Sequence, residues 1–148
     1  MKISIESSIL VEYLKGNQTD LLEQLISSGH ELYTNVIVYS EFIFYYLAIV
    51  GGKSPLTIKE NKQIKEIIQK YEPIDIFSYF TILPIENEIT SLSYNYMQKY
   101  NLLPNDALIL ATTKLNDIEY LASFDKKDFQ QPCNDESITL IMSVADLK

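Results

Sequence analysis

The segment KISIESSILVEYL at residues 2–14 joins a strand pattern directly to a helical pattern. Lys2–Ile5 contains two isoleucines in a short run, which predicts a β-strand. Either Ser7 or Ser8 is suited to cap a helix, and the pattern that follows predicts that helix over Ile9–Lys15. A strand that runs straight into a helix is the unit from which alternating α/β folds are built.

The same alternation continues to the end of the chain. Further strands are predicted at Glu31–Thr34, Phe80–Leu83, Ile118–Ser123 and Ser137–Ile141. Helices are predicted at Asp20–Ser28, Val36–Val50, Thr57–Tyr71, Glu86–Tyr100 and Asp106–Leu115, with a helical turn at Ile74–Tyr79 and a loop or single turn at Phe124–Phe129. Asn35 is placed to cap the second of these helices. We therefore expect an α/β fold, a three-layer α/β/α sandwich with a central, mainly parallel sheet of about five strands, as one domain over residues 1–148.

Composition restricts the possible functions. The 148 residues include 12 basic and 20 acidic side chains, for a net charge of −8, so the chain does not resemble a protein that holds nucleic acid by charge alone. One cysteine and one histidine exclude an intrachain disulfide and argue against a zinc site. No targeting segment is visible, and the longest apolar stretch, Val36–Val50, contains Glu41 and is too short to span a membrane. These features favour a cytoplasmic protein.

Four acids fall where the predicted strands end. Glu6 follows the first strand, and Glu41 lies in the apolar helix after the second. Asp106 opens the helix before the fourth strand, and Asp125 comes just after that strand. Each acid also has an ordinary structural alternative. Glu41 can be paired within its helix and Asp106 can cap a helix, whereas Asp125 can lie in a surface turn and Glu6 at a solvated strand end. Parallel sheets bind ligands at the carboxyl ends of their strands, so the joint placement predicts one site.

The residue types indicate the chemistry of that site. Carboxylates without histidine or cysteine suit hard cations, so we expect Mg²⁺ or Mn²⁺. Such acidic cages typically serve phosphoryl chemistry, in which the metal activates water and neutralises a phosphate. Lys15, Lys126 and Lys127 are candidate contacts for RNA phosphates, although they can equally be solvated surface residues.

At this point the sequence resembles the PIN-domain family, and within it the VapC-type toxins of prokaryotic toxin–antitoxin systems. The resemblance covers nearly the whole chain, and any one of its motifs alone is weakly specific. Four motifs occur in the family order, IESSILVEYL at residues 5–14, TNVIVYSE at 34–41, PNDALILA at 104–111 and LASFDKKDF at 121–129.

The resemblance implies a metal-dependent endoribonuclease that a cognate VapB-type antitoxin holds inactive and that usually forms a homodimer. The catalytic and metal-binding acids carry over to Glu6, Glu41, Asp106 and Asp125, with Asp128 as an additional metal ligand or substitute. Ser8, or else Ser7, would orient the water or the first acid, and Ser123 lies in the fourth motif as a further supporting residue.

One position departs from the family pattern. Glu6 stands where the family has aspartate, and the extra methylene displaces the carboxylate in a site whose metal has strict geometric demands. The site can have adapted and remain active, or the chain can be a weakened or silent PIN-fold binding module, or the residue can have been introduced. A PIN-domain nuclease of RNA processing is the other alternative to a toxin.

Aromatic residues gather on the apolar helix. Phe42, Tyr45 and Tyr46 are the predicted contacts for the antitoxin, because antitoxins of this family lay a helix or an extended tail across the toxin. The alternative is that these residues only pack within the core. Given the acidic balance, RNA binding is expected to be weak and to depend strongly on metal.

Overall fold

Five parallel strands form one sheet at the centre of the protein. A computed structural model describes residues 1–147. The strands are β1 (Lys2–Ile5), β2 (Glu31–Asn35), β3 (Thr81–Leu83), β4 (Tyr120–Ala122) and β5 (Thr139–Ile141). Their order in the sheet is β3-β2-β1-β4-β5, and every neighbouring pair is parallel. The expected α/β fold with a parallel sheet of five strands is confirmed.

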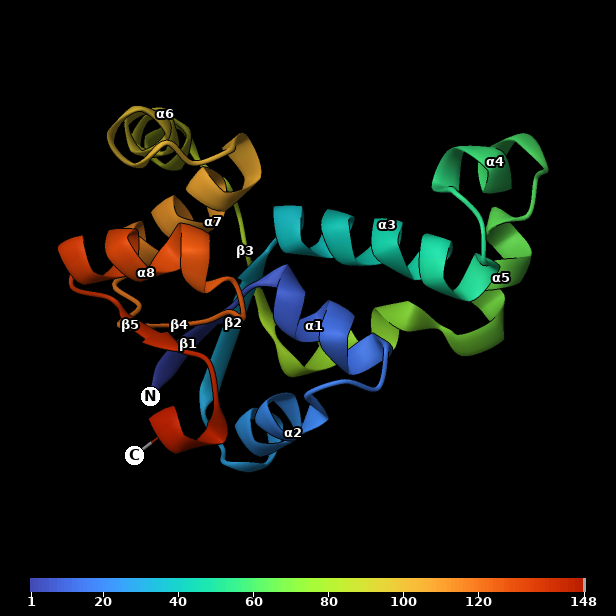
Figure 1. The fold of residues 1–148 in the computed structure, drawn as a ribbon, viewed down its shortest axis with the longest axis horizontal. Helices are drawn as coiled ribbons and strands as arrows, with labels where there is room; N and C mark the ends of the chain where they lie inside the picture. The colour runs from blue at the N-terminus through green and yellow to red at the C-terminus, as the bar shows by residue number, and fades with distance from the viewer. Residues whose placement is uncertain (148) are drawn as a thin grey trace.

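Helices cover both faces of this sheet and give the three layers (Figure 1). They are α1 (Ser7–Leu14), α2 (Thr19–Ser27), α3 (Val36–Gly51), α4 (Pro55–Glu60), α5 (Ile64–Tyr71), α6 (Asn87–Tyr100), α7 (Pro104–Leu115) and α8 (Lys126–Asp135), with 3₁₀ turns at Pro73–Tyr79 and Val144–Asp146. Helices α1 and α2 lie on one side of the strands and α7 and α8 on the other, with α6 packed on α7. Helix α3 runs outward and carries α4 and α5 at its far end (Figure 1).

The strand order reverses between β1 and β4. From β1 the chain moves to β2 and β3, whereas from β4 it moves the opposite way to β5. Glu6 directly follows β1, and its backbone N–H donates to the carbonyl of Ala122 at the end of β4 over 3.0 Å. Ligands of open parallel sheets bind at such a reversal, beyond the carboxyl ends of the strands. The topology therefore places Glu6 at the expected ligand site.

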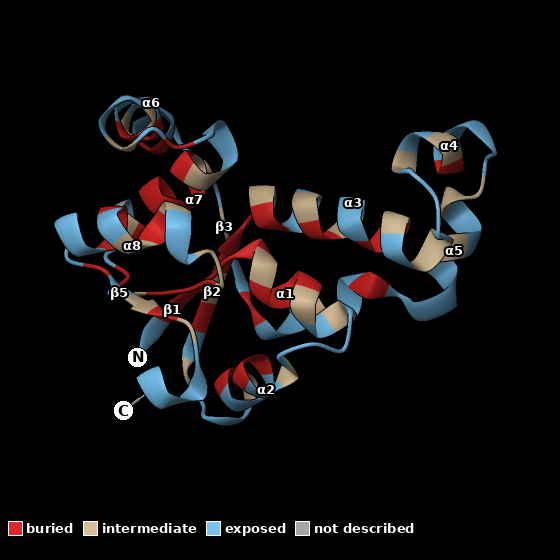
Figure 2. Cartoon of the chain, viewed as in Figure 1, coloured by how far each residue is buried: buried red, intermediate tan, exposed pale blue. Residues whose placement is uncertain are grey.

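The core lies between the strands and the helix faces turned toward them (Figure 2). Ile3 and Ile5 of β1 and Leu121 of β4 are fully buried, as expected for strands covered on both faces. Leu10 of α1 and Phe129 of α8 are also fully buried. The elements that carry the site therefore rest on a closely packed support.

Two helix caps were predicted from the sequence, and one prediction is wrong. Asn35 caps α3 as expected, since its side chain accepts from the N–H groups of Ile37 and Val38 at 3.0 and 3.1 Å. Helix α1, by contrast, begins at Ser7, and its cap is Glu6 instead of Ser7 or Ser8. The glutamate side chain is long enough to fold back onto the first turn of the helix.

Two other segments differ from the prediction. The helix expected over residues 57–71 is divided into α4 and α5, because Lys62 between them adopts a left-handed backbone with φ of 56°. The loop or single turn expected at residues 124–129 instead contains the start of α8, which continues through Pro132 to Asp135. Asp125 caps α8, and Phe129 and Cys133, one turn apart, are buried. This packing outweighs the unfavourable proline.

Helix α3 is less buried than its apolar sequence suggests. Part of the helix packs on α1 and neighbouring elements, but the helix extends past the sheet, so several of its apolar residues face solvent. Its exposed apolar residues are Val36, Tyr39, Phe44, Tyr45 and Ile49. Within residues 1–147, no helix combines the length and apolar character needed to cross a bilayer.

Candidate active site

A cavity of about 290 Å³ opens at the carboxyl edge of the sheet. All four acids predicted to form a site line it, namely Glu6, Glu41, Asp106 and Asp125. The rest of its lining is Ser7, Ser8, Val11, Glu12, Lys15 and Tyr45. The structure thus brings together acids that are up to 119 positions apart in the sequence.

Glu6 is almost completely buried and richly hydrogen-bonded. Its Oε1 accepts from the hydroxyl of Ser7 at 2.6 Å. Its Oε2 accepts from the backbone N–H of Ser8 at 3.0 Å, from the Ser8 hydroxyl, and from the Ser123 hydroxyl at 2.9 Å. These four donors hold the carboxylate at the start of α1, and all three serines predicted as supporting residues contact it.

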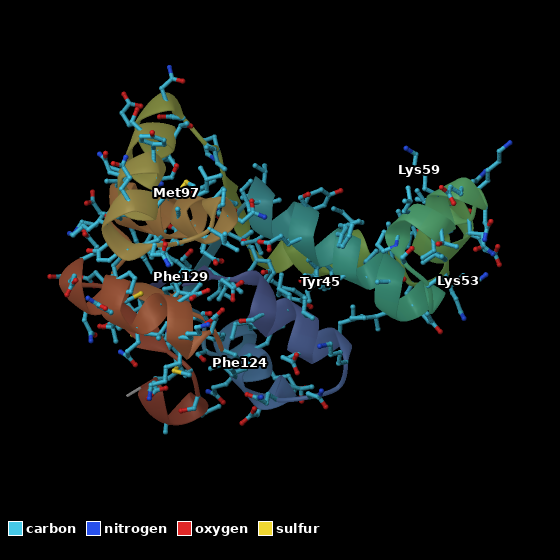
Figure 3. The ribbon with its side chains drawn as sticks, turned by 45° about the horizontal axis from the view of Figure 1, so that its top comes forward. Tyr45, Lys53, Lys59, Met97, Phe124 and Phe129 are labelled. Atoms are coloured by element: carbon cyan, nitrogen blue, oxygen red, sulfur yellow. The ribbon has the colours of Figure 1, made fainter. Side chains whose placement is uncertain are left out.

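The same serines connect the two halves of the site. Ser8 Oγ accepts from the N–H of Phe124 at 2.9 Å, and Ser123 Oγ accepts from the N–H of Asp125 at 3.0 Å. The loop that carries Phe124 thereby closes against α1 (Figure 3). Asp125 in turn accepts from the N–H of Asp128 at 3.0 Å. The serines therefore fix the position of Asp125 relative to Glu6.

Glu41 extends from α3 toward the same cavity. The Ser7 hydroxyl lies 3.5 Å from its Oε1. Burial, followed by the nearby charge of Glu6, raises the pKa of Glu41, whereas hydrogen bonds from Asn105 and Ser7 lower it. Asn105 was not predicted as a site residue, although its position directly before Asp106 in the third motif was a usable signal.

Among the acids of the site, Asp106 has the most strongly shifted pKa. It lies in the first turn of α7, and burial makes the largest contribution to a pKa raised to about 7. The negative charges of Glu6, Asp128, Glu41 and Asp125 add to that rise in the pKa. Asp128 therefore acts electrostatically on the site although it does not line the cavity. A bound cation would reverse this balance, since it stabilises carboxylates in their charged form.

The donor set suits a hard divalent cation. The available ligands are carboxylate and hydroxyl oxygens, the type that Mg²⁺ and Mn²⁺ prefer. Within residues 1–147, however, no three acidic, histidine or cysteine side chains stand close enough to hold an ion as they are. The acids share a cavity but are not preassembled as a coordination shell, so metal binding requires side-chain rotation. The concentration of negative charge around Asp106 supports the fit.

The predicted RNA-contacting lysines have different surroundings. Lys15 lies at the cavity and pairs with Glu12, its Nζ 3.0 Å from Glu12 Oε1. Lys126 and Lys127 are exposed in the first turn of α8 but do not line the cavity. All three remain candidates for contacts with phosphate.

The three predicted partner contacts on α3 also differ in their exposure to solvent. Tyr45 is 46% exposed and lines the acidic cavity (Figure 3). Phe42 and Tyr46 are only 3% and 2% exposed. The Phe42 ring packs against that of Phe77 at 5.7 Å, and the Tyr46 hydroxyl donates to the carbonyl of Ile67. Of the three, only Tyr45 keeps a large exposed surface.

The raised pKa of Asp106 predicts how the metal-free protein responds to pH. An aspartate with an ordinary pKa of 3.8 titrates near 7 here, so the folded state binds more protons than the unfolded state between these values. The free energy of unfolding should therefore fall as pH rises through this window. We expect Asp106→Asn to remove much of this fall and to be about 1–3 kcal/mol more stable than the native chain near pH 8. Urea unfolding in EDTA near pH 5 and pH 8 tests this, and identical pH dependence in both proteins would contradict it.

Fold and site together define a three-layer α/β protein with an acidic cavity at the switch point of a parallel sheet. The family model for the PIN domain matches residues 3–134. The chain therefore belongs to the PIN domain family.

Two curated relatives share about a third of the sequence. Ribonuclease VapC2 of Methanocaldococcus jannaschii is 35% identical over 132 residues, covering 88% of this chain and 88% of that protein. Ribonuclease VapC6 of the same organism is 34% identical over 140 residues, covering 87% and 91%.

Solved structures of the same fold include two complexes. VapBC-1 from nontypeable Haemophilus influenzae contains a chain that matches with a TM-score of 0.65 and 16% identity, covering 95% of this chain and 97% of that one. A toxin–antitoxin complex from Klebsiella pneumoniae matches with a TM-score of 0.61 and 21% identity, covering 95% and 96%. At these identities the likeness concerns the fold.

Proposed function

We propose that this chain is a metal-dependent endoribonuclease that acts as the toxin of a toxin–antitoxin pair. The observation that carries the proposal is the convergence of Glu6, Glu41, Asp106 and Asp125 on one cavity at the switch point of the sheet. Two relatives about one third identical over most of the chain, both named as VapC ribonucleases, support the same reaction.

The acids would have distinct tasks. Glu41, Asp106 and Asp125 would hold Mg²⁺ or Mn²⁺, with Asp128 as a further ligand or electrostatic helper. When bound, such a cation lowers the pKa of water and offsets the charge of a phosphodiester group. With the cation bound and the carboxylates in their charged form, one or more of these acids would also position or deprotonate the attacking water. Water would attack the phosphorus in line with the leaving oxygen, so that a new P–O bond forms as the bond to the 3′-oxygen breaks, leaving a 5′-phosphate and a 3′-hydroxyl that takes up a proton.

Glu6 would position the site more than it would bind metal. Its carboxylate already accepts four hydrogen bonds and caps α1, so ligation would compete with the donors from Ser7, Ser8 and Ser123. This arrangement provides a physical reason for weakened metal affinity where the family residue is a shorter aspartate. We infer that Glu6 belongs to the site and reduces its affinity for the cation.

The partners would be RNA, a VapB-type antitoxin and a second copy of the chain. The fold is shared with chains of VapBC and toxin–antitoxin complexes, and α3 exposes several large apolar residues that a protein can cover. Such a pair would act in the cytoplasm. A homodimer would appear in light scattering at twice the 17.1 kDa chain mass, and a mass of one chain at all concentrations would exclude it.

The proposal is tested by incubating the purified chain with end-labelled RNA in Mn²⁺, Mg²⁺ or EDTA. Cleavage is expected with either metal and should be lost in EDTA, because the carboxylates that line the cavity repel a phosphate unless a cation offsets their charge. Calorimetry with Mn²⁺ should show binding in the same buffer. Absence of both binding and cleavage, with a folded protein, would identify a silent PIN-fold module instead.

A further inference from the structure

We propose that the lobe formed by residues 53–71, here called the basic lobe, binds the phosphate backbone of the RNA substrate away from the carboxylate cavity. This inference rests on the proposed ribonuclease function and adds a second contact surface to it. The basic lobe contains α4, α5 and their flanking residues, and it lies at the outer end of α3 (Figure 1).

The charge of the protein is unevenly distributed. The basic lobe holds five of the 12 basic residues and two of the 20 acids, which makes its net charge +3 and leaves −11 for the rest of the chain. Its lysines are Lys53, Lys59, Lys62, Lys65 and Lys70, and all are exposed. A polyanion repelled by the acidic body would be attracted to this end.

These lysines are also available for a ligand. In the part of the chain that the structure describes, ion pairs form at Lys15, Lys99 and Lys114, and none forms at a lysine of the basic lobe. Figure 3 shows the labelled Lys53 and Lys59 side chains at the edge of the lobe, directed away from the body. Lys53 and Lys70 also border a hollow of about 200 Å³. Such unpaired ammonium groups can contact phosphates without first breaking a salt bridge.

Helix α3 connects the basic lobe to the cavity. Glu41, Tyr45 and Ile49 are spaced four residues apart, so they follow one side of the helix from the cavity toward the lobe. Tyr45 lines the cavity and Ile49 is exposed. An RNA strand that follows this side of the helix would cross the ring of Tyr45, on which a base can stack. At 1.5 Å per residue, Glu41 lies only about 15 Å from the lobe end of α3. One RNA strand can therefore reach both.

An exposed aromatic ring in the basic lobe favours single-stranded RNA over a second protein as the ligand. Lys70 lies over the ring of Tyr71, with its Nζ 5.1 Å from the ring centroid, and Tyr71 is 63% exposed. Proteins that hold single-stranded nucleic acid combine basic grooves with such exposed rings. A second copy attracted through its acidic body is the competing occupant, and the experiment below distinguishes the two.

The test compares two variants with the same change in net charge. The lobe variant carries Lys53→Gln, Lys59→Gln and Lys65→Gln, and the control carries Gln24→Glu, Asn95→Asp and Gln98→Glu on α2 and α6. Binding of a labelled single-stranded RNA is measured by anisotropy in EDTA at several salt concentrations, because the lysines of the lobe, unlike the carboxylates of the cavity, attract phosphate without a metal. The lobe variant should lose at least about tenfold in affinity near 50 mM salt and about 2 in the slope of log affinity against log salt, because each phosphate contact contributes about 0.7. The control should retain the native slope.

Cleavage assays separate this inference from the proposed function. With metal, the lobe variant should cleave a dinucleotide as fast as the native chain, because the single internucleotide phosphate of that substrate would occupy the cavity and leave none for the lobe. The KM for a long RNA should rise about tenfold at unchanged kcat. Equal affinities and slopes for the two variants, or no RNA binding by the native chain, would overturn the inference. Loss of self-association without loss of RNA binding would assign the lobe to a second copy. RNA binding through the lobe without any cleavage would contradict only the proposed function.

Discussion

The substitution Asp106→Asn should reduce metal-dependent RNA cleavage by at least about 100-fold. Asparagine has nearly the same shape but cannot carry the negative charge that holds a cation. Asp106 lies within the influence of four other acids, and burial together with those charges raises its pKa to about 7. The native chain therefore accepts an electrostatic cost at this position that a bound cation would offset. Calorimetry should show a parallel loss of Mn²⁺ affinity.

The matched control is Asp117→Asn, two residues beyond the C-terminal end of α7. Asp117 is exposed and has a φ of 52°, a backbone conformation that asparagine adopts readily, so activity and stability should remain native. Because Asp106→Asn should also unfold at higher urea concentration near pH 8, lost activity could not be attributed to unfolding. Cleavage and Mn²⁺ binding by Asp106→Asn within threefold of the native chain would rule out the assigned role.

The substitution Glu6→Ala should lower the free energy of unfolding by about 2–4 kcal/mol. It removes the cap of α1 and the acceptor for the hydroxyls of Ser7 and Ser123, which are 5% and 0% exposed. Relief of repulsion between carboxylates offsets part of this cost. Urea unfolding near pH 7 measures the change.

Glu12→Ala on the same helix is the control and should change stability by less than about 0.5 kcal/mol, because its pair with Lys15 is solvent-exposed. Equal stability losses in both variants would contradict a special role for Glu6.

A shorter acid in place of Glu6 tests whether this residue weakens metal binding. Glu6→Asp restores the family residue, and its carboxylate cannot retain all the serine donors, which leaves it freer to ligate. We expect Mn²⁺ affinity and cleavage rate to increase about tenfold. Glu41→Asp makes the same chemical change at a position that already follows the family pattern and should lower both. Equal Mn²⁺ affinities and cleavage rates for Glu6→Asp and the native chain would show that Glu6 does not impair the site.

Much of the site could be predicted because parallel strands end at one edge of a sheet. Glu6 and Asp125 follow neighbouring strands, so their meeting required only the correct fold class. The hydrogen bond from Ser123 to Glu6 could not be predicted in the same way, since it joins residues 117 positions apart and depends on side-chain rotation. Asn105 was missed although it stands beside Asp106 in the third motif, because its hydrogen bond to Glu41 joins two helices and has no local sequence pattern.

Helices were predicted well where local signals agreed with packing. Asn35 has the right residue type and position for a cap, and it caps α3. Helix α8 was missed because Pro132 and a polar composition argue against a helix, whereas burial of Phe129 and Cys133 stabilises one. The same limitation concealed the exposed side of α3, since an apolar sequence does not reveal whether a helix extends beyond its sheet.

Local residue patterns sufficed to establish the α/β class, the acidic edge and the family resemblance, because periodicity and motif order are properties of the chain alone. The tertiary structure decided which donors surround each acid, how far the pKa of Asp106 rises and where the lysines lie relative to the cavity. Those properties depend on distance and burial, which arise only when remote segments pack together. The basic lobe illustrates the difference, since five lysines in residues 53–70 can be counted in the sequence, but their position at the outer end of α3 follows from the fold.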